Sequence, residues 1–299
     1  MADMARYPRL MPTDPRLFTA EVLRSERLAP SFQRVTVCGP ELAGFEYNGF
    51  DHWFRLFLPP RAGLPLHLPA VAGRGWYKPY LAIPEGTRPH CSNYTVAGVR
   101  TIDGRTELDI DVVIHTDARG TVAGAVAIWA TTTTPGSPVA LLDQGTLFDP
   151  PTDMEGVHLV SDESGLPALR GILRHLGGHQ SGTAIIEVPT AGDIEQLVAP
   201  AGVAVTWLTR DAGTDTGTGA VAGTAHAPAA AEHHSAPGRR ALEALCETVT
   251  PHPRDYAFVV GESTLATEGR RALHRAGLPK SRITFSGFWK HTPHAHAAP

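Results

Sequence analysis

The pattern of apolar residues changes near Pro150-Pro151, and this change limits what the chain can fold into. Before the two prolines, apolar and polar residues alternate in short runs with a period of two, which is typical of half-buried strands. After them, strand-like runs alternate with segments in which apolar residues recur at helical spacing. A chain of 299 residues is long enough for about two domains. We therefore predict one domain over residues 1–150 and a second over residues 151–299.

The first half contains about six strand-like runs with little helix between them. The run over residues 107–114 alternates acidic and aliphatic residues, and Pro59-Pro60 stops the run that begins at Trp53. Closing such a sheet into a barrel removes its open edges, so we predict an antiparallel six-stranded β-barrel. The predicted strands cover residues 18–23, 32–37, 53–58, 94–96, 107–114 and 138–142.

The second half alternates strands with helices, which predicts a parallel, doubly wound α/β sheet. We expect strands at residues 157–160, 184–188, 203–208, 256–260 and 283–285, and helices around residues 166–176, 242–245 and 263–276, with Ser263 as an N-cap. Sheets of this kind bind ligands at the carboxyl ends of their strands. Residues 211–236 are rich in Gly, Ala, Thr and His without periodicity, so we expect a flexible surface loop there.

Composition excludes several classes of protein. The chain has 26 Lys and Arg against 30 Asp and Glu, a formal charge of −4, which argues against a whole-surface binder of nucleic acid or anionic membrane. Its 3 cysteines form no CxxC pair, and its histidine-rich stretches lack a rigid scaffold, so we predict no disulfide framework and no metal site. No apolar stretch could span a membrane, and residues 1–15 lack a secretory pattern. We expect a cytoplasmic protein and leave its oligomeric state open.

Seven ordered motifs, spread over residues 17–290, carry a resemblance to a known family. Asn93-Tyr94-Thr95-Val96 resembles the RxYT/S flavin signature of ferredoxin-reductase-like proteins, and DESGLPA at 162–168 resembles the DETALPA segment of siderophore-interacting proteins. Further segments resemble that family's HVKLLF, LDVDFVLH, WA…PGD, YAWVAGE and SGYWR motifs, and they lie at 52–57, 108–115, 129–136, 256–262 and 286–290. The chain is thus similar to siderophore-interacting proteins, which are FAD-containing reductases of ferric siderophores that take electrons from NAD(P)H or ferredoxin.

The resemblance implies a function and a set of site residues. FAD would bind the barrel, NADH or NADPH would dock on the α/β domain, and a ferric siderophore would be the substrate. Tyr94 and Thr95 would pack on the isoalloxazine and hydrogen-bond near its N5, which makes them the catalytic candidates. Arg55 and Lys290 would bind the anionic substrate. The cofactor-binding candidates are Ser92, Tyr94, Thr95, His115, Gly124, Ala125, Trp129, Asp162, Glu163, Gly261, Glu262 and Trp289.

Three departures from the family pattern bear on FAD. Ser92 stands where the family has an arginine expected to pair with the FAD pyrophosphate, and Ala97 replaces a second arginine. Asp143 falls in a turn that is GPxG-like in the family, where an inward-pointing carboxylate would repel pyrophosphate. Arg100 or Arg119 could supply the missing charge.

Two alternatives to the reductase function stay open. The fold could be retained without reductase chemistry, as in a small-molecule-binding or non-redox biosynthetic protein. The chain could instead be a flavin reductase that serves a partner protein. On the nicotinamide side, Arg210 and Arg239-Arg240 could reach a 2′-phosphate or be ordinary surface charges.

Overall fold

The computed structural model describes residue 12 and residues 15–73, 75–116, 120–211 and 236–291. The chain divides into two compact units, one formed mainly by residues up to Asp149 and the other mainly by residues from Pro150 onward. Among the described residues, no helix has both the length and the apolar character needed to cross a membrane. The predicted loop at 211–236 falls almost entirely outside the described residues.

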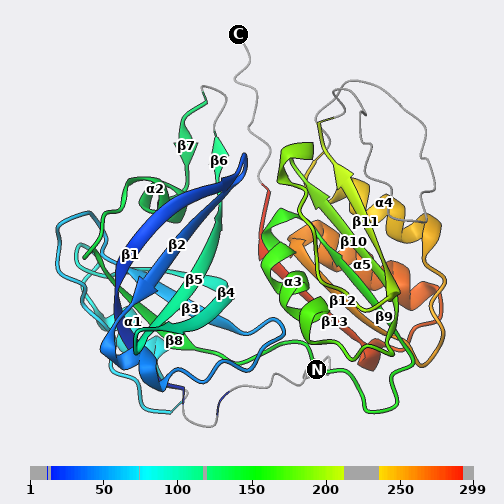
Figure 1. Ribbon diagram of the computed structural model, residues 1–299, viewed down its shortest axis with the longest axis horizontal. Helices are drawn as coiled ribbons and strands as arrows, with labels where there is room; N and C mark the ends of the chain where they lie inside the picture. Colours follow the sequence, from blue (N-terminus) through cyan, green and yellow to red (C-terminus); the bar gives the residue numbers. More distant parts are fainter. Residues whose placement is uncertain (1–11, 13–14, 74, 117–119, 212–235, 292–299) are drawn as a thin grey trace. The chain divides into compact units, whose positions relative to one another are not determined.

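The first unit is built on a closed barrel of six antiparallel strands in the order β1-β2-β5-β4-β3-β8, which confirms the predicted barrel (Figure 1). Its interior is filled by one apolar cluster that includes Phe54, Leu56 and Ile110. The six strands are β1 (Leu17–Ala29), β2 (Phe32–Cys38), β3 (Trp53–Leu58), β4 (His90–Ile102), β5 (Arg105–Val113) and β8 (Pro138–Asp143). Alternation along each strand predicted these elements, although β1 and β4 extend well beyond the predicted runs.

Two helices and a small hairpin join the barrel strands, and periodicity did not predict them. Helix α1 (Tyr77–Ala82) lies in the long connection between β3 and β4. Helix α2 (Ala125–Thr132) follows the hairpin of β6 (His115–Thr116) and β7 (Val122–Ala123), and it buries Val126, Ala127 and Ala130 against the barrel core. Both helices are too short to show a helical repeat in the sequence.

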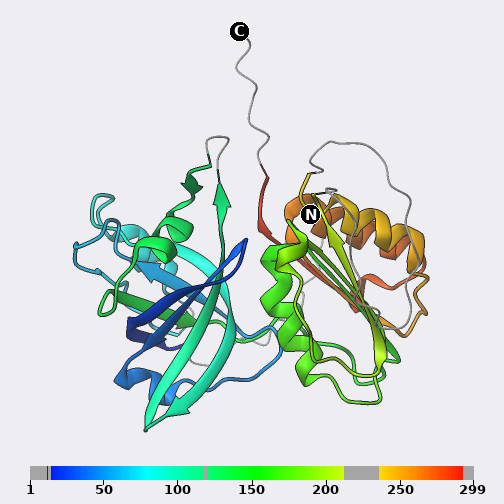
Figure 2. The same cartoon turned by 45° about the horizontal axis from the view of Figure 1, so that its top comes forward.

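The second unit is a parallel five-stranded sheet in the order β11-β10-β9-β12-β13, as predicted. Helices α4 and α5 pack together on one face, whereas α3 begins on the other, which is the doubly wound arrangement (Figures 1 and 2). The strands are β9 (Gly156–Ser161), β10 (Ser181–Val188), β11 (Gly202–Thr209), β12 (Tyr256–Glu262) and β13 (Ile283–Trp289), and the helices are α3 (Leu166–His175), α4 (Arg239–Thr248) and α5 (Ser263–Arg275).

The strand order fixes where a ligand of the second unit can bind. The chain starts in the central strand β9, moves outward through β10 and β11, and returns to β12 on the other side of β9. The connection after β9 therefore leads toward β10 on one side of the sheet, and the connection after β12 leads toward β13 on the other side. Ligands of doubly wound sheets bind outside the carboxyl ends of the strands at such a switch point. Here those ends carry Asp162 and Glu262.

Candidate functional site

Tyr94 and Thr95 occupy opposite faces of β4. Tyr94 pairs with Phe54 of β3 and packs against the barrel core, whereas Thr95 pairs with Trp53 on the other face. Burial raises the pKa of the Tyr94 hydroxyl, so it stays protonated and can donate a hydrogen bond. Among the described residues, neither hydroxyl has a hydrogen-bond partner. Two hydroxyls are therefore free to bind an acceptor that the protein does not supply.

The indole of Trp53 adds a third free donor to this part of the barrel. Its Nε1 is buried and has no hydrogen-bond partner among the described residues. Buried donors are normally satisfied, and an exception calls for an explanation such as a missing ligand. The carbonyl oxygens and ring nitrogens of an isoalloxazine are acceptors of the kind that these three donors lack. The Trp53 indole and the Thr95 hydroxyl share one face of the sheet and would suit the edge of a flavin ring, whereas the Tyr94 hydroxyl belongs to the other face of β4.

At the position where the FAD pyrophosphate is expected, the chain has fewer charged partners than the family pattern. Ser92 faces the same side of β4 as Tyr94, and its hydroxyl lies 2.7 Å from His90 Nε2. His90 is half-buried, and burial lowers its pKa, which favours the neutral imidazole. Where the family pattern has an arginine, this chain therefore has a neutral serine–histidine pair.

The start of α2 supplies neutral donors for a phosphate. Gly124 precedes the helix, and no side chain caps the backbone N–H groups of the first turn, where Ala125 is exposed. Such N–H groups, together with the helix dipole, favour an anion. The β6–β7 hairpin sets His115 opposite Ala123, next to this helix start. Trp129, one turn further along, packs against the barrel core.

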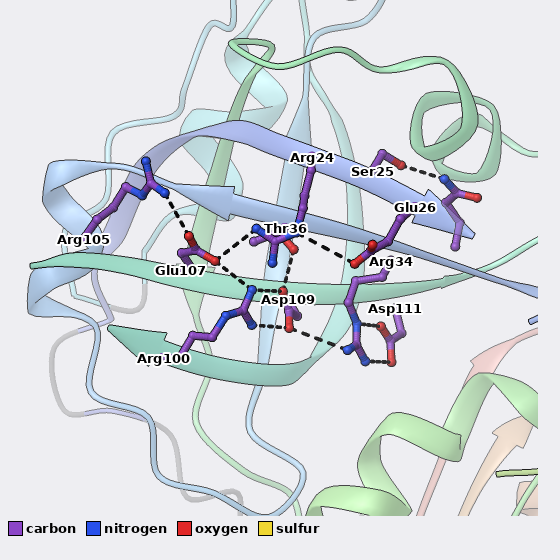
Figure 3. Close-up of polar contacts among 11 residues, drawn as sticks. Arg24, Ser25, Glu26, Arg34, Thr36, Arg100, Arg105, Glu107, Asp109 and Asp111 are labelled. Atoms are coloured by element: carbon purple, nitrogen blue, oxygen red, sulfur yellow. Dashed lines mark hydrogen bonds and ion pairs between the residues drawn. The ribbon is translucent and has the colours of Figure 1, made fainter. Parts of the chain in front are cut away.

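Arg100 does not supply the missing charge, contrary to expectation. Its Nη1 donates to Asp109 at 2.5 Å, and its Nη2 donates to Glu107 at 2.8 Å. These bonds belong to a network on the outer face of β1, β2, β5 and β4, shown in Figure 3. Ala97 is buried beside an irregularity in β4. The other suggested substitute, Arg119, lies outside the described residues.

Asp143 is held by a histidine, so the expected repulsion of pyrophosphate is not supported. Its Oδ1 lies 2.8 Å from His52 Nε2 and accepts the backbone N–H of Gly145 at 2.9 Å. The other ring nitrogen of His52, Nδ1, accepts the Asn48 backbone N–H at 3.0 Å, so the ring proton belongs on Nε2. The ring is fully buried and stacks on Phe45. Both ring nitrogens of His52 and the Oδ1 atom of Asp143 thus belong to a structural pair.

Arg55 lies on the outer face of the barrel, next to aromatic rings. Its guanidinium donates to Asn93 Oδ1 at 3.0 Å and Gln144 Oε1 at 3.2 Å. It also lies 4.5 Å from the centre of the Trp76 ring and 5.5 Å from that of Trp53, which is cation–π geometry. Its partners in these contacts carry no charge.

In the second unit, Asp162 joins the carboxyl ends of three strands. Its side chain is completely buried; Oδ1 accepts Ser164 N and Oγ, and Oδ2 accepts Glu262 N at 2.7 Å and Trp289 Nε1 at 3.0 Å. Burial and the neighbouring Glu163 carboxylate raise the pKa of Asp162 to about 6, although these bonds oppose the shift. Gly261 has a φ of 126°, and a Cβ on it would lie 2.6 Å from Asp162 Oδ1. Glycine is therefore required there.

Glu163 faces a different set of partners. It is fully buried and receives both terminal nitrogens of Arg210 at 2.6 Å each. Arg210 also donates to Glu187 at 3.0 Å, and Glu187 accepts the backbone N–H groups of Gly238 and Ala241 at the start of α4. This cluster links the ends of β9, β10 and β11. Its carboxylates are used inside the protein.

The candidate cations for a 2′-phosphate differ in exposure. Arg210 is only 10% exposed and is committed to two carboxylates, so it is not a surface charge. Arg240 donates to the carbonyl of Thr209. Arg239 is exposed and forms an i,i+4 pair with Glu243. Of the three, Arg239 is the one whose charge stays mostly in water.

The remaining predicted residues lie at the end of β12 and β13. Glu262, not Ser263 as we expected, caps α5, because its carboxylate accepts the N–H groups of Thr264 and Leu265. Burial acts to raise the pKa of Glu262, but these backbone bonds lower it overall. Ser263 instead donates to the Trp289 carbonyl at 2.7 Å. Lys290 is exposed and makes no hydrogen bond or ion pair with the described residues.

Sequence reasoning therefore gathered part of the site and missed part of it. The structure brings Asp162, Gly261, Glu262 and Trp289 together, and it brings His115 to the start of α2. It places Glu163 in a separate cluster with Arg210. The free indole of Trp53 was missed. It could have been found by aligning the β3 and β4 runs, because Trp53 is the antiparallel partner of Thr95.

Comparison with known proteins identifies the family. Residues 21–146 match the model of the siderophore-interacting FAD-binding domain, and residues 154–292 match that of siderophore-interacting proteins. The chain belongs to the siderophore-interacting protein family. The motifs predicted this family and a ferredoxin-reductase-like fold, and both predictions are confirmed.

Two curated relatives of this siderophore-interacting protein have named activities. The NADPH-dependent ferric-chelate reductase of Escherichia coli is 31% identical over 214 residues, which cover 71% of this chain and 78% of that relative. The ferric vibriobactin reductase ViuB of Vibrio cholerae is 30% identical over 206 residues, covering 69% of this chain and 68% of the relative.

Solved structures agree on the fold. A siderophore utilization protein from T. fusca is 26% identical and superposes with a TM-score of 0.73, covering 97% of this chain and 99% of that one. The siderophore-interacting protein SipS from Aeromonas hydrophila is 22% identical, with a TM-score of 0.65 over 94% of this chain and 100% of that one. The second likeness concerns the fold alone.

Proposed function

We propose that this protein is a flavin-dependent reductase that takes electrons from NADPH or NADH and delivers them to iron(III) held by a siderophore. The observation that carries the proposal is the set of free donors in the FAD-binding domain, at Trp53, Tyr94 and Thr95. The E. coli relative named as a ferric-chelate reductase supports the same chemistry.

FAD, when bound, would accept a hydride from the nicotinamide and pass single electrons to iron. The protein would contribute placement. Tyr94 and Thr95 would donate hydrogen bonds to the ring system, and the free N–H groups at Gly124 and Ala125 would receive phosphate oxygens. Ser92 would add a neutral donor, and His115 and Trp129 would border the phosphate site.

The nicotinamide nucleotide would bind at the carboxyl ends of β9 and β12. Asp162, Glu163 and Glu262 would act as positioning residues there, since each carboxylate is already bonded within the unit. Gly261 would let the backbone pass close to Asp162, and Trp289 would border the site from β13. In this proposal the three carboxylates do not contact the nicotinamide nucleotide. They hold the backbone that surrounds it.

Arg55 and Lys290 would attract a ferric siderophore that is anionic, because both side chains carry positive charge and Lys290 is exposed. Reduction would release the metal, since iron(II) is held less tightly than iron(III) by hard oxygen ligands. No residue of the protein would need to ligate iron. In the described parts of the chain, no cluster of His, Cys, Asp and Glu could hold a metal ion.

A second function is favoured by one specific observation. The flavin-binding strand lacks its arginine at Ser92, and Arg100 is committed to Asp109 and Glu107. Loss of a charge-assisted bond costs about 1.5–3 kcal/mol, which weakens binding roughly tenfold to a hundredfold. A chain that no longer retains FAD could keep the fold as a non-redox binding protein.

The visible spectrum of the purified protein separates the two functions. We expect flavin absorption after incubation with FAD, bleaching on addition of NADPH or NADH under argon, and recovery when a ferric siderophore is added. A protein that is colourless after incubation with FAD and removal of the unbound FAD would exclude the reductase. Bleaching without recovery by any ferric complex, but with recovery by a flavin-accepting partner, would favour a flavin reductase instead.

A further inference from the structure

One stretch of β4, residues 90–95, has a strand paired to it on only one side. This stretch pairs with β3 along its length, with His90 opposite Leu58. On the other side, β5 pairs with β4 only from Val96 onward, and among the described residues no further strand joins β4. The stretch therefore has an edge to which no strand is hydrogen-bonded. A ligand lying along this edge would have access to side chains on both faces of β4.

Three polar side chains line one face of this stretch. His90, Ser92 and Tyr94 occupy alternate positions, which places them on the same side of the strand. The family motif assigns the flavin ring to Tyr94 and the pyrophosphate to the position of Ser92, so His90 is the next side chain in the same direction. The Nε2 atom of His90 lies 2.7 Å from the Ser92 hydroxyl. The imidazole is thus hydrogen-bonded to the residue that replaces the arginine.

The charge of a protonated His90 is not neutralised within the described parts of the chain. The side chain is half-buried and makes no ion pair with the described residues. Burial lowers the pKa of His90, and among the described residues no carboxylate raises it. A bound anion would act in the opposite direction, because a negative charge beside the imidazole favours its protonated form. The charge of His90 therefore depends on whether an anion is present.

The titratable and charged side chains around His90 are bonded elsewhere or stay neutral. Arg88 donates to two backbone carbonyls at the end of α1, and the Tyr80 hydroxyl donates to a third backbone carbonyl. Cys91 lies on the opposite face of β4, and burial raises the pKa of its thiol to about 11, so it carries no charge at neutral pH. Leu58, the partner from β3, is apolar.

We propose that His90 binds the pyrophosphate of FAD in place of the family's arginine, and that FAD therefore binds more tightly as the pH falls. The inference rests on the proposed function and assigns a further residue to its cofactor site. An arginine stays charged, whereas an imidazole gains and loses its proton near neutral pH. In a protonated His90, Nε2 would donate to the Ser92 hydroxyl and free its proton for a phosphate oxygen. Nδ1 would offer a charge-assisted bond to a second oxygen.

The direction of the pH effect follows from proton linkage. If FAD raises the pKa of His90, the complex holds more protons than the free protein over the pH range between the two pKa values. Binding then takes up protons, and the affinity for FAD rises as the pH falls through this range. A difference of one unit between the two pKa values changes the dissociation constant by up to about tenfold.

Titration of the full-length protein, freed of flavin, tests the inference without NADPH. Flavin fluorescence gives the dissociation constants for FAD and for riboflavin, which lacks the pyrophosphate, at about pH 6 and about pH 8. We expect the wild type to bind FAD about three- to tenfold more tightly at the lower pH, and riboflavin equally within about twofold. Calorimetry in two buffers of different ionisation enthalpy should show proton uptake with FAD and none with riboflavin.

Variants separate His90 from other titrating groups. His90→Gln keeps a hydrogen-bonding group beside Ser92 but cannot be charged, so its FAD affinity should be the same at both pH values within about twofold. His67→Gln replaces an exposed histidine of the same unit and should behave like the wild type. Ser92→Arg supplies a permanent charge and should bind FAD tightly at both pH values. Asp51 and Asp162, whose pKa values are raised to about 6, are present in every variant, so they cannot account for a difference between variants.

Two results would overturn the inference. One is equal FAD affinity of the wild type at the two pH values, and the other is an unchanged pH dependence in His90→Gln. Circular dichroism shows whether each variant is folded before affinities are compared.

The outcome is separable from that of the proposed function. FAD binding that depends on pH and on His90, with no NADPH-driven reduction of any ferric complex, would remove the reductase and keep the His90 assignment. Reduction of a ferric complex, with an FAD affinity that depends neither on pH nor on His90, would keep the reductase and remove the assignment. Absence of FAD binding at both pH values would remove both.

Discussion

His52 Nε2 and Asp143 Oδ1 lie 2.8 Å apart although 91 residues separate them in the sequence. The pair connects the residues before β3 with the end of β8, and the backbone N–H groups of Asn48 and Gly145 complete it. The carboxylate is directed at the histidine.

Replacing Asp143 tests this orientation. Asp143→Ala leaves the buried Nε2–H of His52 without an acceptor, which should lower the free energy of unfolding by about 1–3 kcal/mol. FAD affinity should not increase, because Asp143 Oδ1 is already bonded to His52 and to the Gly145 backbone. Urea unfolding and fluorescence titration with FAD measure the two effects. Glu46→Gln, which removes an exposed charge nearby, is the control, and tighter FAD binding by Asp143→Ala alone would contradict the assignment.

Restoring the family's cation should strengthen the FAD site. Ser92→Arg adds a charge-assisted partner for pyrophosphate, so the dissociation constant for FAD should fall by about tenfold or more. Thr101→Arg adds the same charge to an exposed position further along β4 and should have little effect. Flavin fluorescence gives the affinity, and circular dichroism shows that each variant is folded. A folded Ser92→Arg protein with unchanged affinity would place the pyrophosphate elsewhere.

Asp162 should make stability depend on pH in a defined direction. Its pKa in the folded protein is about 6, above the ordinary value of about 3.9, so the folded state binds the proton more tightly than the unfolded chain. The contribution of Asp162 is therefore largest below pH of about 4 and falls as pH rises through about 6. Urea unfolding of wild type and Asp162→Asn from acid to neutral pH checks this. The stability difference should shrink with rising pH, and a growing difference would refute the shift.

The arginines of the network in Figure 3 should contribute unequally to the stability of the barrel. Arg100 bonds to two buried carboxylates, Glu107 and Asp109, whereas Arg105 is more exposed and bonds to Glu107 alone. Arg100→Met should destabilise the barrel by about 1–3 kcal/mol because it leaves buried charge short of a partner. Arg105→Met should cost less than about 1 kcal/mol. Equal losses in denaturant unfolding would show that both act as surface pairs.

The sequence predicted the strands well because their alternation is local. The acidic and aliphatic alternation in β5 marked a two-faced strand, and the structure confirmed it. The sequence did not show that the acidic face is also buried. Glu107 and Asp109 lie under arginines from β1, β2 and β4, and only the strand order brings these together. Burial of a charge therefore depended on topology that periodicity does not contain.

The candidate site was harder to predict for a similar reason. Motifs located Asp162 and Glu262, but they did not show that the Asp162 carboxylate is used up by Glu262 N and Trp289 Nε1. Nor did they show that Arg210 is held between two glutamates. A motif gives the position of a residue along the chain, whereas its free hydrogen-bonding capacity depends on neighbours from distant strands.

Asp51 has a consequence for how the barrel unit moves. Its two carboxylate oxygens accept the backbone N–H groups of Leu147 and Phe148, each at 3.0 Å, and its side chain is buried. These two amides lie outside the regular strands, yet their protons are shielded from solvent as those of a sheet are. In hydrogen–deuterium exchange these two amides would exchange slowly, although they lie in a loop. Their protection would depend on the side chain of Asp51. A loop can in this way be as rigid as the strands it joins.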